Sequence, residues 1–394
     1  MGRQDGGVLM SRQKTVVVLG GGVGGVATAR ELRKRLPRQH RIILIDRERE
    51  HLFAPSLLWL MVGLRRAEEI KRPLSRLERK GIEVRYGEIE KVDAEARSVT
   101  VAGAVIEADY LVVSLGAELS PETIPGLREA GCNFYTLSGA EQFRDALSSL
   151  KRGRIVVLTA APAYKCPAAP YEAALLIHHY LRERGRSGAV TVEVYAAEPG
   201  PMGVAGPDVS AAVKQMLEAK GIPYHPEHQV KTVDPAAKRI EFTNGAGADF
   251  DLLAYVPPHR APQVVRESGL ASDNGWISVD RHTMETHFSG VYAIGDVLSI
   301  PLKLGKPLPK AGVFAHAQGE VVARNIASVI RGGTGAERFN GHGECFIESG
   351  GGKAGFGGGN FYAEPVPLIR LRAPSRRWHL GKVLFEKSWL RFKL

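Results

Sequence analysis

The stretch Thr15-Val-Val-Val-Leu-Gly-Gly-Gly-Val-Gly-Gly25 decides the fold of this 394-residue chain. Its first five residues form an apolar, largely β-branched run that is typical of a buried parallel strand. The glycines that follow fit the pattern G-x-G-x-x-G, and Val26–Arg33 predicts a helix. A second apolar run, Arg41–Ile45, ends at Asp46. This order of strand, glycine turn, helix, strand and acid predicts a dinucleotide-binding unit.

Each part of this unit has a physical task. Gly20 allows a tight turn, Gly22 lets the backbone approach a pyrophosphate, and Gly25 lets the helix pack closely on the strand. The helix N-terminus offers free N–H groups and a positive dipole end to the phosphates. Asp46 ends the second strand, where its carboxylate can accept hydrogen bonds from a ribose. The predicted contacts of the cofactor here are Gly20, Gly22, Val23, Gly24, Gly25, Asp46 and Arg47.

Two further strands point to the identity of the dinucleotide. Gly290-Val-Tyr-Ala-Ile-Gly-Asp296 predicts a short strand that ends in Gly-Asp, and Asp109-Tyr-Leu-Val-Val-Ser-Leu-Gly116 predicts another that ends in glycine. In two-domain flavoproteins, strands of these kinds mark where the chain leaves the FAD domain and returns to it, and the aspartate holds the ribityl chain. The pair favours FAD over NAD and adds Gly116, Gly295 and Asp296 to the predicted contacts.

A second unit begins with the strand Arg154–Leu158 but lacks the glycine turn. The chain continues Thr159-Ala-Ala-Pro-Ala-Tyr-Lys-Cys-Pro-Ala-Ala-Pro-Tyr-Glu172, which predicts a helix over Glu172–Arg184 and then a strand over Val190–Tyr195. Proline removes N–H donors and fixes φ, so this turn cannot cradle a pyrophosphate in the same way. We predict a Rossmann-like domain that does not bind NAD(P)H.

Cys166 lies in this altered turn, beside Lys165 and before the predicted helix. A cation and a helix N-terminus both stabilise a thiolate, so the setting predicts a lowered thiol pKa. The alternative is a buried and inert cysteine.

The segment Lys165–Glu172 resembles the cysteine motif of sulfide:quinone oxidoreductases and of the flavoprotein subunit of flavocytochrome c sulfide dehydrogenases. Asn340-Gly-His-Gly-Glu-Cys-Phe-Ile-Glu-Ser-Gly350 resembles their second cysteine motif. Further resemblances lie near the expected flavin and where the chain returns to the FAD domain: Phe53–Ser56, Val256–His259, Gly275–Val279 and Leu308–His316. The resemblance covers nearly the whole chain. It adds as expected FAD contacts Pro55, Ser56, Lys310, Ala311 and Gly312.

By this resemblance, Cys166 and Cys345 are the redox pair on the flavin face opposite the quinone. Hydrosulfide attacks their disulfide or sulfur-bridged form and makes a persulfide on one cysteine, and the electrons pass to FAD. Phe53–Ser56 contains no cysteine, so FAD is expected to be non-covalent. Many quinone-reducing members carry a third cysteine where this chain has Tyr135, and Cys132 is predicted to be structural.

The remaining site predictions each keep an alternative open. Lys310 is placed near the flavin N1–C2 region, where a cation stabilises reduced flavin. His316 is a proton donor to quinone or a core histidine, and Glu172 is a proton relay or a first-turn helix acid. Aromatic rings suit a quinone head, with core packing as the alternative for each. The predicted quinone contacts are Phe346, Phe361 and Tyr362.

The C-terminal stretch Trp378–Leu394 mixes aromatic residues with Lys and Arg, and a helix is expected from Leu380 onward. Such a stretch suits a membrane interface, with basic side chains on phospholipid headgroups. An ordinary docking helix is the alternative. With a lipid-soluble acceptor implied, we expect peripheral attachment to a membrane surface that deletion of Ser388–Leu394 would weaken.

Composition narrows the partners. The net charge is +11, but basic residues are spread along the chain and no nucleic-acid module is found, so an anionic surface or substrate is favoured over nucleic acid. Three cysteines make no disulfide framework, and no Cys/His spacing fits a zinc site. Met1–Lys14 has no apolar core like a secretory signal, which predicts a cytoplasmic protein, peripheral on the inner face of the cell membrane.

These patterns predict an α/β protein with two Rossmann-like domains. The FAD domain takes residues 1–116 and 285–335, the inserted domain takes residues 117–284, and a C-terminal segment takes residues 336–394. The function that the resemblance implies is oxidation of sulfide to polysulfide or sulfur, with electrons passed through FAD to quinone. The alternatives are a protein electron acceptor, an NADH:quinone oxidoreductase, and a redox-sensing or sulfur-carrier protein. The sequence is compatible with a homo-oligomer.

Overall fold

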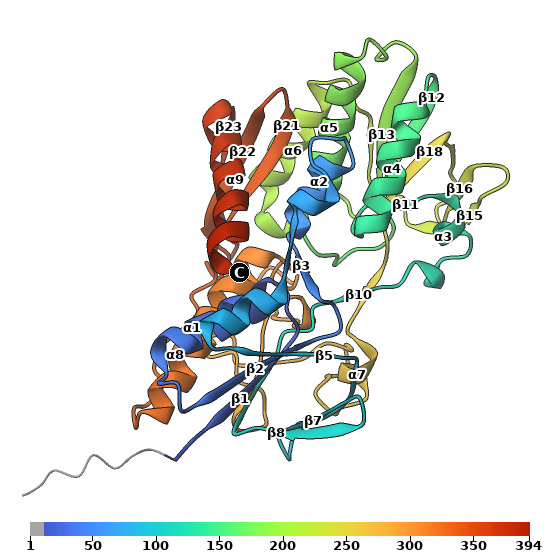
Figure 1. The fold of residues 1–394 in the computed structure, drawn as a ribbon. Coiled ribbons are helices and arrows are strands. Elements are labelled where there is room, and N and C mark those ends of the chain that lie inside the picture. The colour runs from blue at the N-terminus through green and yellow to red at the C-terminus, as the bar shows by residue number, and fades with distance from the viewer. Residues whose placement is uncertain (1–11) are drawn as a thin grey trace, which may run out of the picture.

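The computed structural model describes residues 12–394. Its main sheets are two five-stranded parallel sheets and a C-terminal three-stranded antiparallel sheet, with smaller antiparallel sheets beside them (Figure 1). The polar start of the chain, on which the expected cytoplasmic location rests, lies mostly outside these residues. The α/β fold class with two Rossmann-like sheets is confirmed.

The first parallel sheet has the order β20-β9-β1-β2-β5. Its strands are β1 (Thr15–Leu19), β2 (Arg41–Asp46), β5 (Glu83–Tyr86), β9 (Tyr110–Val113) and β20 (Val291–Ala293). β20 comes from far along the chain and pairs in parallel with β9, Val291 opposite Leu111. Segments on both sides of a long insertion therefore build one sheet.

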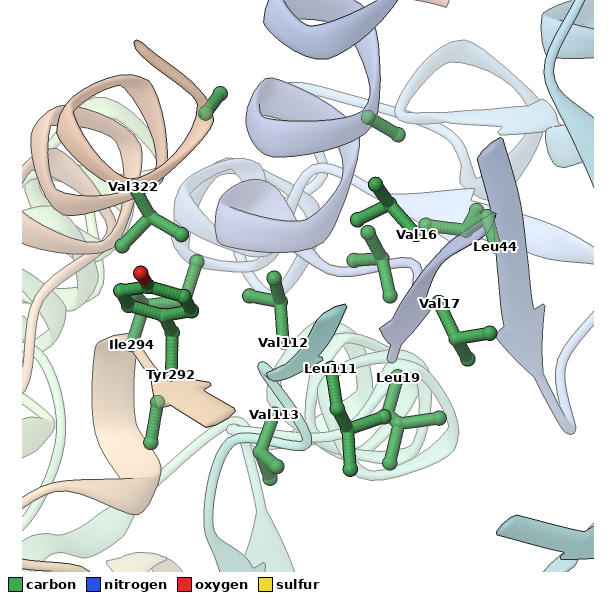
Figure 2. Packing of buried hydrophobic residues seen from close by; sticks show 14 of the residues in the cluster. Val16, Val17, Leu19, Leu44, Leu111, Val112, Val113, Tyr292, Ile294 and Val322 are labelled. Atoms are coloured by element: carbon green, nitrogen blue, oxygen red, sulfur yellow. The ribbon is translucent and has the colours of Figure 1, made fainter. Parts of the chain in front are cut away.

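The strands of this sheet are apolar because they are enclosed. Residues Val16–Leu19 are fully buried, and α1 (Val23–Arg35) packs on α8 (Gly312–Ile330) beside them. α1 begins at Val23, three residues before the predicted start, so the last two glycines of the turn are already helical. Figure 2 shows part of this core, including Val17, Leu44, Val112, Val113, Ile294 and Val322.

The second parallel sheet has the order β11-β18-β12-β13-β14. α5 begins at Ala169, before the predicted Glu172, and holds Pro170 in its first turn, where the missing N–H of proline leaves no intrahelical bond unmade. The strands are β11 (Cys132–Asn133), β12 (Gly153–Thr159), β13 (Val190–Ala196), β14 (Tyr224–His225) and β18 (Leu252–Val256). The helices are α4 (Leu137–Ser149), α5 (Ala169–Glu183) and α6 (Pro207–Glu218).

The C-terminal sheet is antiparallel and consists of β21 (His342–Gly350), β22 (Lys353–Asn360) and β23 (Leu368–Ser375). β21 packs on α5, which brings the second cysteine motif to the first. α9 (Arg376–Ser388) packs on β22, as the red segments of Figure 1 show. The expected helix start at Leu380 is wrong, because the Ser375 side chain accepts a hydrogen bond from the Trp378 N–H and caps the helix earlier.

The last residues of the chain fold back onto the first sheet. Trp389–Lys393 forms a π-helical turn, and the side chains of Trp389, Leu390 and Leu394 are buried in the same core as β1. These apolar side chains have protein partners. The docking alternative therefore holds for these three side chains, and membrane attachment by the rest of the stretch Trp378–Leu394 stays a prediction.

Short elements surround the three sheets. β10 (Glu118–Leu119) and β19 (His259–Arg260) pair where the chain passes between the two parallel sheets. The other strands are β3 (Glu50–Leu52), β4 (Lys71–Pro73), β6 (Ile89–Asp93), β7 (Ser98–Val101), β8 (Ala104–Glu107), β15 (Val230–Asp234), β16 (Arg239–Phe242) and β17 (Gly247–Asp249). The other α-helices are α2 (Leu57–Leu60), α3 (Leu127–Ala130) and α7 (Gln263–Arg266).

Candidate active site

The glycine turn after β1 has the shape of a phosphate cradle. Gly20 has φ +97°, and a Cβ on Gly25 would lie 1.8 Å from the Gly20 carbonyl oxygen, so side chains are excluded there. A Cβ on Gly22 would meet nothing within 4 Å. The turn is therefore tight on its protein side and open beside Gly22. Asp46 stabilises it by accepting a hydrogen bond from the Gly21 N–H at 2.5 Å.

Asp296 lies in a 3-10 turn directly after β20. Its Oδ1 atom is shielded from water and accepts no hydrogen bond from the described residues. Burial raises the pKa of this carboxyl group above its ordinary range. A buried acceptor without a donor fits a hydroxyl-bearing ligand such as the ribityl chain of FAD.

The ammonium group of Lys310 is held by hydrogen bonds and a ring contact within the protein. Its Nζ donates hydrogen bonds of 2.7 Å to the carbonyl oxygens of Asp296 and Leu298, and lies 3.3 Å from the centre of the Trp276 ring. Burial lowers the pKa of Lys310 to about 8. The ammonium group therefore braces the Asp296 turn, and its predicted contact with the flavin stays a prediction.

Cys166 and Cys345 border one apolar cavity. Cys166 precedes α5 and Cys345 lies on β21, so the cavity forms where two distant parts of the chain meet. Its volume is about 60 Å³. Most other residues that line it are apolar, among them Pro167, Ala168, Met202, Val204, Val209, Phe314, Ile347, Phe361, Ile369 and Leu371. Soft, uncharged sulfur species suit such a lining.

Burial governs the thiols in this cavity. It raises the pKa of Cys345 to about 11 and raises that of Cys166 further, and the neighbouring Cys345 adds to the second shift. The expected lowering of the Cys166 pKa is wrong, because loss of solvation outweighs the helix N-terminus. Burial also raises the pKa of Cys132, to about 11, but Cys132 does not line the cavity.

The Cys166 turn is held in a conformation that side chains seldom adopt. Cys166 has φ +50°, in the left-handed region. Its N–H donates to the Lys310 carbonyl oxygen at 2.6 Å. The Tyr135 hydroxyl donates to the carbonyl oxygens of Lys165, at 2.8 Å, and Cys166, at 3.2 Å. Tyr135, the residue predicted at the position of the third cysteine, thus anchors the turn that carries Cys166.

A buried ion pair lies beside the cavity, and the sequence analysis identified only one of its two members, Glu172. Lys382 Nζ, on α9, lies 2.6 Å from Glu172 Oε1, on α5, and the two side chains are 7% and 3% exposed. Burial lowers the pKa of Lys382, but the carboxylates of Glu172 and Glu348 outweigh it and raise the pKa. A lysine in a basic tail gives no local signal that it will be buried; only the contact of α9 with the core reveals it.

The acid after β13 is already engaged by three hydroxyl groups of its own domain. In a nucleotide-binding Rossmann unit, an acid at this place binds a ribose. Here Glu198 accepts hydrogen bonds from the hydroxyls of Tyr164 at 2.5 Å, Tyr171 at 2.8 Å and Thr159 at 2.8 Å. The second sheet therefore lacks both the glycine turn and a free acid.

Comparison with known proteins agrees with this geometry. The sequence pattern of the pyridine nucleotide-disulphide oxidoreductases matches residues 14–319. The sulfide-quinone reductase of Aquifex aeolicus is 32% identical, over 96% of this chain and 90% of the relative. This chain belongs to the sulfide:quinone oxidoreductase family. The crystal structure of the Aquifex aeolicus sulfide:quinone oxidoreductase has a TM-score of 0.86 at 28% identity, over 96% of this chain and 90% of that one.

Other relatives are more distant. The mitochondrial sulfide:quinone oxidoreductase of Mus musculus is 23% identical, over 85% of this chain and 75% of the relative. The type II NADH:quinone oxidoreductase of Haemophilus influenzae is 24% identical, over 80% and 81%. Membership of the sulfide:quinone oxidoreductase family makes this chain an FAD-dependent oxidoreductase. The open face of Gly22 and the unpartnered Asp296 carboxylate fit that cofactor.

The structure distributes the predicted quinone contacts of this family member unevenly. Phe361 lines the cysteine cavity, and the ring of Phe346 lies 5.1 Å from that of Phe356. Tyr362 is used elsewhere, since its hydroxyl donates to the Arg281 carbonyl oxygen at 2.8 Å and its ring carries the Arg281 guanidinium. His316 faces the Trp389 ring, 5.5 Å away between centroids.

Ser56, a predicted flavin contact, is tied to α9. Its hydroxyl donates a hydrogen bond to Glu386, which also receives two N–H groups of Arg65. Glu386 is almost fully buried, so the link is part of the packing between the loop after β3 and the C-terminal helix. Contact of Pro55 and Ser56 with FAD stays a prediction.

Proposed function

We propose that this chain is a sulfide:quinone oxidoreductase that oxidises sulfide at Cys166 and Cys345 and passes the electrons through FAD to a quinone. The observation that carries the proposal is the meeting of both cysteines in one apolar cavity, next to a second domain whose glycine turn is replaced by a proline-containing turn. Relatives named as sulfide:quinone oxidoreductases support it.

In the oxidised form the two cysteines share a disulfide or bridging sulfur. Hydrosulfide attacks the sulfur of one cysteine, a new S–S bond forms there, and the other cysteine leaves as a thiolate with the electron pair. Lys382 lowers the pKa of both thiols and so stabilises this thiolate against the burial that opposes it. FAD, when bound, supplies a two-electron acceptor that can in turn be oxidised by quinone.

The contact roles of the glycine turn, Gly116, Gly295, Asp296 and residues 310–312 toward FAD belong to this proposal, as do the domain limits at residues 116, 285 and 335. The quinone site is proposed near Phe346, since Phe361 lines the cysteine cavity instead. The Phe346 ring offers a flat apolar surface for a quinone head. A homo-oligomer stays a prediction.

We further propose that α9 and the turn after it rest on an anionic membrane surface on the cytoplasmic side. Leu380, Leu384 and Phe392 are 57%, 57% and 60% exposed. Exposed basic residues lie among them: Arg376, Arg377, Lys387 and Arg391. Apolar side chains beside cations suit an interface with anionic lipid. Among the described residues, no helix is long and apolar enough to cross a membrane.

Vesicle sedimentation tests this surface. We expect Leu380→Glu with Leu384→Glu to reduce binding to vesicles that contain anionic phospholipid. Val105→Glu is the matched control, because Val105 is 65% exposed on a strand of another part of the molecule. Equal binding of the double variant and the control would contradict the proposal.

Anaerobic titration of the purified flavoprotein tests the function itself. We expect sulfide, but not NADH, to bleach the flavin absorbance, and decylubiquinone to restore it. Cys166→Ala and Cys345→Ala should abolish the bleaching, and Cys132→Ala should retain it, since Cys132 lies outside the cavity. Bleaching by NADH alone would replace the proposal with an NADH:quinone oxidoreductase.

A further inference from the structure

Ionisable side chains lead from the cysteine cavity to the protein surface. The inner pair is Glu172 and Lys382, 2.6 Å apart, and both act electrostatically on the Cys345 thiol. The Glu172 carboxylate also accepts a hydrogen bond of 2.8 Å from the backbone N–H of Glu348. β21 is thus hydrogen-bonded to the inner pair through Glu348, three residues after Cys345.

The outer pair is Glu348 and His379. Both carboxylate oxygens of Glu348 lie 3.0 Å from His379 Nδ1. Glu348 is 1% exposed, whereas the His379 side chain is 31% exposed. The imidazole therefore reaches solvent while its partner does not. An imidazole is the side chain that exchanges protons most readily near neutral pH.

The charges of the cluster leave room for one mobile proton. The carboxylates of Glu172 and Glu348 face a single ammonium group, that of Lys382. From α2, the ring of Trp59 covers the cluster, 5.0 Å from Lys382 Nζ and 6.0 Å from the His379 ring, and brings no charge. One negative charge in a buried cluster is costly, and burial raises the pKa of Glu348 above its ordinary range.

We infer that Glu348 and His379 carry the proton released in the cysteine cavity to solvent. The inference rests on the proposed function. Hydrogen sulfide that enters the apolar cavity gives up one proton as it becomes the attacking hydrosulfide. The proton that stays on the persulfide is the one that two-electron reduction of a flavin consumes, so the first proton is the one to be exported. That proton passes to Glu172. Neutral Glu172 no longer competes for Lys382, so the ammonium acts more strongly on Glu348, which loses its own proton through His379.

A competing route exists at the other edge of the cavity. Glu344 borders the cavity and is exposed, so it could take the proton directly to solvent. Its carboxylate has no hydrogen bond to the ionisable groups of the cluster among the described contacts. The experiment therefore includes Glu344→Gln as a variant that would reveal this route.

Proton release is measured directly by stopped flow. Oxidised holoenzyme in weak buffer, at a pH where hydrogen sulfide predominates over hydrosulfide, is mixed with sulfide in the absence of quinone. A pH-indicator dye and the flavin absorbance are followed together. For His379→Gln and Glu348→Gln we expect proton release to slow about tenfold or more and to be restored by added imidazole for His379→Gln. His342→Gln, an exposed histidine on β21, is the control that should match the wild type.

The outcomes separate the two proposals. If sulfide does not reduce the flavin of the wild-type protein, the proposed function is overturned, and this inference with it. If sulfide reduces the wild-type flavin and His379→Gln releases protons as fast as the wild type, only the inference is overturned. Slow release in Glu344→Gln with normal release in His379→Gln does the same and assigns the route to Glu344. Slow release without rescue by imidazole makes His379 structural and also rejects the relay.

Discussion

After β1 the chain turns through Gly20–Gly25 into α1, and after β12 it turns through residues 160–168 into α5. Both turns leave the carboxyl end of a central parallel strand and enter a helix. In the first, Gly20 takes the positive φ and the face beside Gly22 is open. In the second, the positive φ angles fall on Ala163 and Cys166, and prolines replace glycines.

The difference shows how one scaffold supports two kinds of site. A turn of glycines presents N–H groups and space, which suit a phosphate. A turn with proline and a side chain in the left-handed region presents a single reactive atom in a fixed place, at the expense of strain. Tyr135 and the Lys310 carbonyl hold the second turn from outside, and the side chains of Asp46 and His51 hold the first.

The largest effect is expected at the reactive atom of the second turn. Cys166→Ala should slow sulfide-dependent flavin reduction by on the order of a thousandfold or more, since the nucleophilic step loses its sulfur. FAD content should stay normal, because the first turn is untouched. Rapid-mixing absorbance measures the rate, with Cys132→Ala as control. A Cys166→Ala rate close to wild type would remove the distinction between the turns.

A smaller effect is expected when the open face of the first turn is filled. Gly22→Val keeps an ordinary φ but places a side chain where the pyrophosphate would lie. We expect FAD to bind about a hundredfold more weakly, through two or so lost charge-assisted hydrogen bonds. Gly188→Val is the control, since Gly188 also has nothing within 4 Å of an added Cβ. Fluorescence titration of the apoprotein with FAD gives both affinities; equal values would contradict the assignment.

The next largest effect is expected on stability, at Glu198 of the second unit, whose carboxylate accepts three hydrogen bonds. Glu198→Ala leaves three hydroxyls without their acceptor, and we expect a loss of about 2–3 kcal/mol of unfolding free energy, near 1 kcal/mol for each bond. Glu218→Ala, at an exposed ion pair on α6, should change stability little. Denaturant unfolding measures both. NADH should still not reduce the variant, because the glycine turn is absent; reduction by NADH would show that Glu198 alone closed the site.

The smallest effect concerns the link between the first turn and the C-terminus. His51 Nδ1 donates to the Gly21 carbonyl oxygen at 2.8 Å, and Nε2 accepts from the Trp389 N–H at 2.9 Å, so the ring is neutral. Burial lowers the pKa of His51 below its ordinary value. The unfolded chain binds the proton first, so this stabilisation is present above about pH 6.5 and is lost as the pH falls below it.

His51→Gln tests that link. We expect it to lower stability by about 1 kcal/mol at pH 7.5, the value of one hydrogen bond, and to converge on the wild type as the pH falls toward 5. Thermal unfolding across this pH range measures the difference. His342→Gln, an exposed residue, should keep the full pH dependence. A constant gap between His51→Gln and wild type would contradict the neutral, pH-sensitive contact.

Much of the fold could be predicted because it depends on local patterns. Apolar runs predicted the strands around Val16–Leu19 and Arg154–Leu158, and the spacing of the glycines predicted the glycine turn. Helix starts were misplaced at α1, α5 and α9. At the last two, Pro170 and the Ser375 cap act within one turn and leave no periodic signal. The cysteine motifs were found by resemblance, not by spacing, because nothing local joins residue 166 to residue 345.

The sequence by itself determined where the backbone forms a glycine turn open to a phosphate and where a proline-containing turn replaces it, because glycine and proline act on the backbone at their own positions. Only the tertiary structure decided the chemistry of the side chains. Packing of β21 on α5 placed Cys345 beside Cys166 and raised both thiol pKa values, against the expectation from Lys165. Packing of α9 buried Lys382 against Glu172, although its surroundings in sequence are those of a solvated basic tail. Solvation and charge pairing depend on what covers a group, and that is settled by contacts between residues far apart in the chain.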